Sequence, residues 1–395
     1  MSTLLSLREF LAMIRWMPRW SIAAALCVAP ARSQPATSPV DFEMSHKLTQ
    51  RTRDEDRADP AKKEYLNLAR AVGAKQLRKG DAAPARVAAV VPRRGTQRPA
   101  PARLTPLTDF GPGERYEGEA GGLYGGGSNI PPESHRKLGE VELAQIKPRD
   151  RTGEPAEDGI IGFVSISMSN ATQEFSHFKV IADRSTLKSP RVTIVDCAQG
   201  GQAMAEWAPP DAKPWEVARE RLDAAGVTVQ QVQVAWIKLA NKAPTGSLEE
   251  HGRKLERDTL AVLHNARILF PNLRVAYLGS RTFAGYATEL AAQRGIGLNP
   301  EPYAFESAFS ARRLILRQIE RDPALALTRV PLLLWGPYLW AEGQHGRKID
   351  SLVWERSDFG PDGVHPSDSG RGKVSAQLLT FLTTNPLAKS WFTGK

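Results

Sequence analysis

The chain has 395 residues, 41% of them hydrophobic and 24% charged, which is enough for one large folded domain with extensions. Its formal net charge is +10, and an excess of Lys and Arg favours non-specific attraction to acidic polymers or membrane surfaces. No helix-turn-helix, zinc-finger spacing or aromatic RNA-binding signature accompanies this charge, so a specific nucleic-acid partner is excluded from our expectations.

The amino-terminal segment has the pattern of an export signal. An apolar run of about ten residues lies within residues 20–33 (WSIAAALCVAPARS) and follows a basic stretch. Such a run is shorter than the roughly 20 residues that cross a bilayer. Small residues at Ala29, Ala31 and Ser33 offer cleavage positions. We therefore predict a signal peptide over residues 1–33, a secreted or periplasmic protein, and no transmembrane segment in the mature chain.

Residues 34–105 differ from the rest in composition. They are rich in Ala, Pro, Arg, Lys, Asp and Glu and contain few large apolar residues. Such a segment buries too little surface to offset its ordering entropy, so we predict a disordered basic linker.

A Gly-rich extension over residues 106–150 is expected to pack on the domain that follows. It lacks the Gly-Lys-Ser/Thr of a phosphate-binding loop. We favour an irregular strap across the sheet. The alternative is a substrate rim over the catalytic mouth, formed by Tyr124, Asn129 and His135.

From residue 159 onward, short apolar runs alternate with helical patterns. The expected strands are 159–167, 191–197, 231–239, 273–280 and 329–335, and the expected helices are 172–186, 214–225, 248–267, 303–321 and 369–383. This alternation predicts an α/β fold for residues 151–386, a three-layer α/β/α sandwich with a mostly parallel five-stranded sheet.

A serine and a late acidic–histidine pair are the candidate catalytic residues. Ser169 follows the first of these strands, where a hydroxyl is exposed at the carboxyl end of the sheet, although Ser-Asn is also a common helix cap. Asp362 and His365 are three residues apart before the last helix. An imidazole oriented by a carboxylate can activate a serine. Alone, such a pair is more often a surface turn or half a metal site than part of a catalytic site.

Three segments resemble blocks of the SGNH (GDSL-type) hydrolases: MSN at 168–170, AQGGQAMAEW at 198–207 and DGVHPSDSG at 362–370. The resemblance spans roughly residues 155–385 and is nearest the carbohydrate acetylesterase, sialate O-acetylesterase-like branch. It implies a flavodoxin-like sheet, with Ser169 as nucleophile supported by Asp362 and His365. It also implies backbone oxyanion donors at Gly200 or Gly201 and, from the shorter match KLAN, Asn241. Ser167 and Met168 replace the Gly-Gln of the family's first block.

We therefore expect a serine esterase that removes small acyl groups, mainly acetyl, from a carbohydrate through an acyl-enzyme on Ser169. Its partner would be a small-molecule or polysaccharide ester, with no cofactor and no metal. Trp207, Trp340 and Trp354 are candidates for stacking on a sugar ring. Two alternatives remain open. One is a non-catalytic carbohydrate-binding or envelope protein that keeps the fold, and the other is an O-acyltransferase with the same triad.

Overall fold

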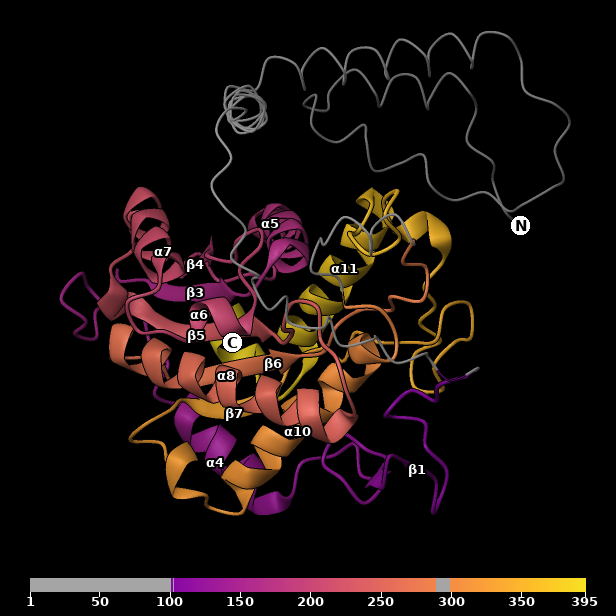
Figure 1. The fold of residues 1–395 in the computed structure, drawn as a ribbon. Coiled ribbons are helices and arrows are strands. Elements are labelled where there is room, and N and C mark those ends of the chain that lie inside the picture. The colour runs from indigo at the N-terminus through magenta and orange to yellow at the C-terminus, as the bar shows by residue number, and fades with distance from the viewer. Residues whose placement is uncertain (1–100, 102, 289–298) are drawn as a thin grey trace, which may run out of the picture. The chain divides into compact units, whose positions relative to one another are not determined.

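The computed structural model describes residues 101, 103–288 and 299–395. The predicted signal peptide and nearly all of the predicted linker lie outside these residues. The main sheet has five parallel strands (Figure 1), in the spatial order β4 (Val192–Asp196), β3 (Ile161–Ile166), β5 (Val232–Lys238), β6 (Val275–Gly279) and β7 (Leu332–Trp335). The predicted five-stranded α/β fold is thereby confirmed.

Helices cover both faces of this sheet because its strands are apolar on both sides. In β3, Phe163 points into one apolar cluster, and Val164 and Ile166 point into the other. Helices that contribute to the Phe163 side are α4 (Glu133–Leu143), α5 (Ser169–Arg184), α11 (Asp368–Thr384) and α12 (Lys389–Thr393). Those on the other side are α6 (Met204–Trp207), α7 (Lys213–Ala224), α8 (Leu248–Leu269) and α10 (Tyr303–Ile319). Short 3₁₀ turns lie at Val229–Gln231, Pro323–Leu325 and Arg356–Asp358.

The helices α5 and α11 pack side by side on one face of the sheet (Figure 1). The helix α5 begins at Ser169, three residues before the start expected from sequence, so the serine belongs to the helix rather than to the loop before it. The sequence pattern did not indicate α4, α6 or α12. Trp391 and Phe392 of α12 are nevertheless buried, so the described chain contributes to the core almost to its last residue.

The Gly-rich extension lies along β7, which forms an edge of the sheet. Leu107 N donates to the Tyr338 hydroxyl at 3.0 Å, and Trp335 Nε1 donates to Leu123 O at 2.7 Å. Leu107 is fully buried. The extension is therefore a strap at the β7 edge, which β5 and β6 separate from β3.

Side chains rather than a further strand satisfy the outer backbone groups of β7. His135 Nε2 donates to Leu333 O at 2.9 Å, and Leu333 N donates to Gln318 Oε1 at 2.8 Å. An edge strand protected in this way offers no template for pairing with another chain.

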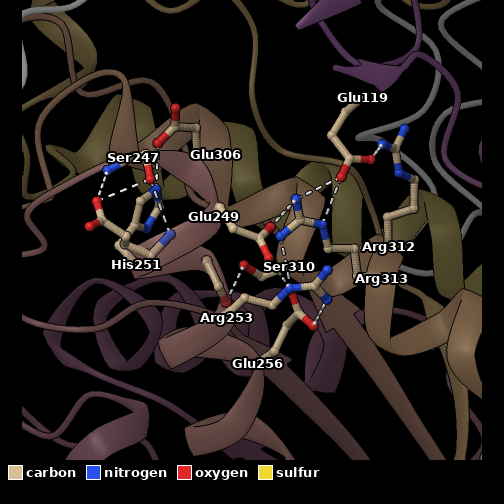
Figure 2. Close-up of polar contacts among 12 residues, drawn as sticks. Glu119, Ser247, Glu249, His251, Arg253, Glu256, Glu306, Ser310, Arg312 and Arg313 are labelled. Atoms are coloured by element: carbon tan, nitrogen blue, oxygen red, sulfur yellow. Dashed lines mark hydrogen bonds and ion pairs between the residues drawn. The ribbon is translucent and has the colours of Figure 1, made fainter. Parts of the chain in front are cut away.

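A small hairpin in the strap, β1 (Arg115–Tyr116) and β2 (Glu119–Ala120), is attached to α10 by ion pairs. Glu119 accepts from Arg312 Nη2 at 2.5 Å and from Arg313 Nη2 at 2.6 Å. Figure 2 shows Glu119 between these two guanidinium groups. A carboxylate shared by two arginines fixes the hairpin against the helix.

Candidate active site

The sheet order places a topological switch point beside β3. The chain runs from β3 outward to β4 and then returns past β3 to β5, so the topology switches direction between β3 and β5. Counted from β3, this is the flavodoxin-like order, in which ligands bind outside the carboxyl ends of the strands at the switch point. Ser169 follows β3 and Asn241 follows β5, so both lie at this edge.

Ser169 is the first residue of α5, after Met168 in an extended conformation. Its Oγ lies 2.8 Å from His365 Nε2, and both side chains are partly exposed. The first amide N–H groups of a helix have no partner within the helix and carry partial positive charge. Ser169 therefore lies where a hydroxyl can be deprotonated and where negative charge is stabilised.

Asp362 orients His365. Asp362 Oδ2 lies 2.6 Å from His365 Nδ1, and Oδ1 accepts from Val364 N and His365 N at 2.9 Å each. A carboxylate facing Nδ1 keeps the proton on that nitrogen and leaves Nε2 free to accept the Ser169 proton. Burial raises the pKa of Asp362, but the hydrogen bonds from Val364 and His365 outweigh it and hold that pKa below its usual value. The carboxyl group is thus ionised at neutral pH.

The loop that carries this pair has little freedom. Gly363 has φ +74°, and a Cβ at that position would lie 1.7 Å from Tyr286 O. Asn170 Nδ2 donates to Val364 O at 2.8 Å, so the residue after the serine holds the histidine loop. Sequence reasoning missed this role of Asn170, although the MSN segment contains it.

Ser167, the other hydroxyl near this strand end, faces elsewhere. Its Oγ donates to Lys238 O, and its side chain is buried. Ser169 is accordingly the serine that the structure brings to His365.

Gly200 and Gly201 form a turn after β4 beside the nucleophile segment. Gln202 N donates to Gln199 O at 3.2 Å, and Gln199 N donates to Ser167 O at 2.9 Å. Gly201 has φ +74°, and a Cβ on either glycine would meet no atom within 4 Å. In the part of the chain that the structure describes, neither glycine N–H donates to another protein group. The turn therefore presents free amide groups next to open space.

Asn241 has a different arrangement. Its Oδ1 accepts from Ala205 N at 2.9 Å, and its Nδ2 donates to Asp258 Oδ2 at 2.6 Å. Its side chain is buried and joins α6 to α8. The oxyanion-donor role implied by the resemblance would have only the second Nδ2 hydrogen available.

The prediction that one of three tryptophans stacks on a sugar ring is wrong. Trp207, Trp340 and Trp354 all have 0% exposure. Trp207 instead contacts the segment before Ser169, since its Nε1 donates to Ser167 O at 3.2 Å. The three tryptophan rings are packed in the protein interior, as is usual for large aromatic side chains.

Within the described ranges, no group of three or more His, Cys, Asp or Glu side chains is arranged to hold a metal ion. The helices of those ranges include none with the length and apolar character needed to cross a membrane.

No family model matches the sequence, and no curated protein matches it. Among solved structures, the chain is similar to a "putative SGNH hydrolase" from Slackia heliotrinireducens, with 15% identity over 56% of this chain and 97% of that one, and a TM-score of 0.30. It is also similar to the periplasmic domain of a lipopolysaccharide acetyltransferase from Salmonella ser. Paratyphi A, with 8% identity over 64% of this chain and 97% of that one, and a TM-score of 0.32. The site is therefore interpreted from its own geometry.

Proposed function

We propose that this protein is a serine-dependent acyl-ester hydrolase that forms an acyl-enzyme on Ser169. The observation that carries the proposal is the continuous chain from Ser169 Oγ to His365 Nε2 at 2.8 Å and from His365 Nδ1 to Asp362 Oδ2 at 2.6 Å. The resemblance to SGNH hydrolases on the same three residues supports it.

The reaction would proceed in two halves. Ser169 Oγ attacks the ester carbonyl carbon while His365 Nε2 takes the hydroxyl proton. The tetrahedral intermediate then expels the alcohol, which receives that proton from His365. Water, deprotonated by His365, attacks the acyl-enzyme, and its collapse returns the proton to Ser169 and releases the carboxylic acid.

Backbone amides are the proposed oxyanion donors. The candidate donors are the free N–H groups of Gly200 and Gly201, in the turn whose Gln199 N donates to Ser167 O, and the amino terminus of α5. Such pre-oriented donors stabilise the developing negative charge without reorganisation. Asn241 would contribute at most through its remaining Nδ2 hydrogen.

The proposed substrate is a carbohydrate carrying small acyl groups, most simply acetyl. The strand-end loops read SMSNAT, AQGGQAMAEW and GPDGVHPSD, and their apolar side chains Met168, Met204 and Trp207 are buried. A polar mouth gains little from a long acyl chain, whereas each buried methylene contributes about 0.8 kcal/mol. Export to the periplasm or outside is part of the proposal, on the apolar run within residues 20–33.

The test is hydrolysis of p-nitrophenyl esters from acetate to octanoate by the wild type, Ser169→Ala and Ser167→Ala. We expect Ser169→Ala to lose about four to six orders of magnitude in kcat with an unchanged circular dichroism spectrum. Ser167→Ala should keep a measurable acyl-enzyme burst. Equal activity of wild type and Ser169→Ala would refute the nucleophile, and a steady rise in kcat/KM toward octanoate would refute the small-acyl substrate.

The same triad serves acyl transfer, in which a sugar hydroxyl replaces water in the second half. Adding unacetylated sugar acceptors to the assay separates the two outcomes, because a transferase would form acetylated sugar faster than free acetate. A wild-type protein that binds carbohydrate and hydrolyses none of the esters would instead be a binding protein with this fold.

A further inference from the structure

Arg281 is a buried cation without a carboxylate in contact. The residue is 2% exposed, and its Nε is buried without a hydrogen-bond partner among the described residues. Its guanidinium makes one polar contact there, from Nη1 to Met168 Sδ at 3.7 Å. A thioether sulfur is a weak acceptor, so the cation is left largely unsatisfied.

Other buried arginines of the described chain form ion pairs. Arg312, at 1% exposure, pairs with Glu119, and Arg347, at 4%, pairs with Asp350. Figure 2 shows the first of these pairs. Arg312 also has a buried Nε without a hydrogen-bond partner, so that feature alone does not set Arg281 apart. Within the described ranges, Arg281 differs from Arg312 and Arg347 because its buried guanidinium has no ion pair.

The position of Arg281 places the cation near the candidate nucleophile. It follows β6 by two residues, and its side chain reaches past the end of β5 to Met168, the residue before Ser169. Burial lowers the pKa of Arg281, and the charges of Glu174, Glu301 and Asp362 oppose that effect. The cation is thus within electrostatic range of the triad carboxylate but does not touch it.

Each of these three carboxylates already has its own donors. Lys238 Nζ contacts both oxygens of Glu174 at 2.6 and 2.7 Å. Asp362 accepts from its own loop and from His365, as described above. Glu301 accepts from three N–H groups, those of Ala284, Phe305 and the Trp340 indole, at 2.8–2.9 Å. None of the three is therefore a vacant partner waiting for Arg281.

A buried cation that lacks a paired anion is costly, and such groups concentrate at functional sites. We propose that the Arg281 guanidinium binds a negatively charged oxygen beside Ser169. The identity of that oxygen rests on the proposed function. It is either the oxyanion of the tetrahedral intermediate or a carboxylate on an acidic sugar ester. Planar N–H donors suit both.

The kinetic test compares Arg281→Gln with Arg274→Gln. Arg274 precedes β6 at the opposite edge of the sheet and also has a buried Nε without a partner, but it pairs with Glu142. With p-nitrophenyl acetate, an oxyanion contact predicts a kcat loss of about 10²–10³-fold for Arg281→Gln and none for Arg274→Gln. If the bound oxygen is a substrate carboxylate, this neutral ester is unaffected and KM for acetylated glucuronic acid rises at least tenfold. No effect on either substrate would overturn the inference and leave the esterase proposal standing.

A binding test is independent of turnover. Acetate affinity is measured calorimetrically on Ser169→Ala, with and without Arg281→Gln or Arg274→Gln. We expect at least a tenfold weaker affinity only when Arg281 is replaced, whether or not the wild type hydrolyses esters. Equal affinity with and without Arg281, including no binding to either, overturns the inference.

Arg281→Lys is measured in parallel because it keeps a buried cation. If the guanidinium N–H groups contact the ligand, the acetate affinity of Arg281→Lys should lie between those of the arginine and glutamine forms. An affinity for Arg281→Lys equal to that of the arginine form would show that only the positive charge matters.

Discussion

Asp362 accepts three N–H groups, two from the backbone and one from His365. It therefore fixes the shape of its own loop as well as the histidine tautomer. Because its folded-state pKa is below the ordinary value near 3.9, it stabilises the fold above about pH 4, and this contribution is lost as pH falls through the folded-state pKa.

Replacing Asp362 with Asn should lower kcat about 10⁴-fold, because the amide favours the wrong tautomer of His365. We expect the Tm of the wild type to fall between pH 5 and pH 2, and the variant should lose part of that fall. Asp368→Asn is the control, since that carboxylate is 93% exposed in the first turn of α11. The role assigned to Asp362 fails if both variants retain wild-type kcat.

Two glycines near the histidine should respond oppositely to alanine. Gly363→Ala forces a Cβ into Tyr286 O from a left-handed backbone, so we expect the loop to shift and kcat to fall about a hundredfold. Gly372 lies inside α11, where a Cβ meets no atom within 4 Å. Gly372→Ala should therefore stabilise the protein by about 0.5–1 kcal/mol with unchanged kcat. Urea unfolding and steady-state kinetics on both variants decide the matter.

At the level of single residues, sequence predicted what is local and missed what is not. Asp362 and His365 stand three apart in one loop, and Ser169 closely follows a strand, so each has a pattern that can be recognised in the sequence. Arg281 has none. Arg281 is notable because the carboxylates near it already accept hydrogen bonds from other groups. Only the fold determines which carboxylates lie nearby and what they bind.

Among the elements, α5 carries the candidate nucleophile Ser169, and a buried ion pair connects this helix to the sheet. Glu174 of α5 and Lys238 at the end of β5 both have fully buried side chains. Burial lowers the pKa of Lys238 to about 8, and the charge of Glu174 opposes that change. The pair thus connects α5 to β5, the strand beside the topological switch point.

Lys238→Met should destabilise the protein by about 3–5 kcal/mol, because it leaves Glu174 buried without a counter-charge. The double variant Lys238→Met, Glu174→Leu should recover most of that loss, since an apolar pair needs no compensation. Guanidinium denaturation of the four members of this cycle gives the coupling energy. Additive effects would show that the two charges do not depend on each other.

The strands were predictable because each is a short, mostly apolar run between turns, and all five were found. The expected ends lie within two residues of the observed ones, except that β7 begins three residues later than expected. Two of the three missed helices were too short to predict. The helix α6 has four residues and α12 has five, too few for a helical period to appear in the sequence. The start of α5 was placed late because its serine and asparagine look like cap residues.

For the whole molecule, the boundary of the folded unit matters for any expression experiment. Leu104 and Leu107 are buried at 5% and 0%, inside the region where sequence composition suggested that a linker ends. A chain that begins at residue 101 should therefore match the full-length Tm and kcat. A chain that begins at residue 110 loses both leucines, at about 2–5 kcal/mol each, and its Tm should fall by at least about 5 °C.

Calorimetry on the two shortened chains checks this. A large loss of Tm in the longer one would mean that residues 1–100 pack on the domain, and no loss in the shorter one would mean that the strap contributes little.

The hydrogen bond between Ser169 and His365 joins positions 196 residues apart, and α11 begins at Asp368, just after the histidine. During synthesis, the ribosome therefore releases the nucleophile long before its base. At about 5–20 residues per second, the serine would wait on the order of ten seconds or more without an activating imidazole. In the proposed mechanism, ester hydrolysis begins only after His365 has been synthesised and the fold has brought it to Ser169.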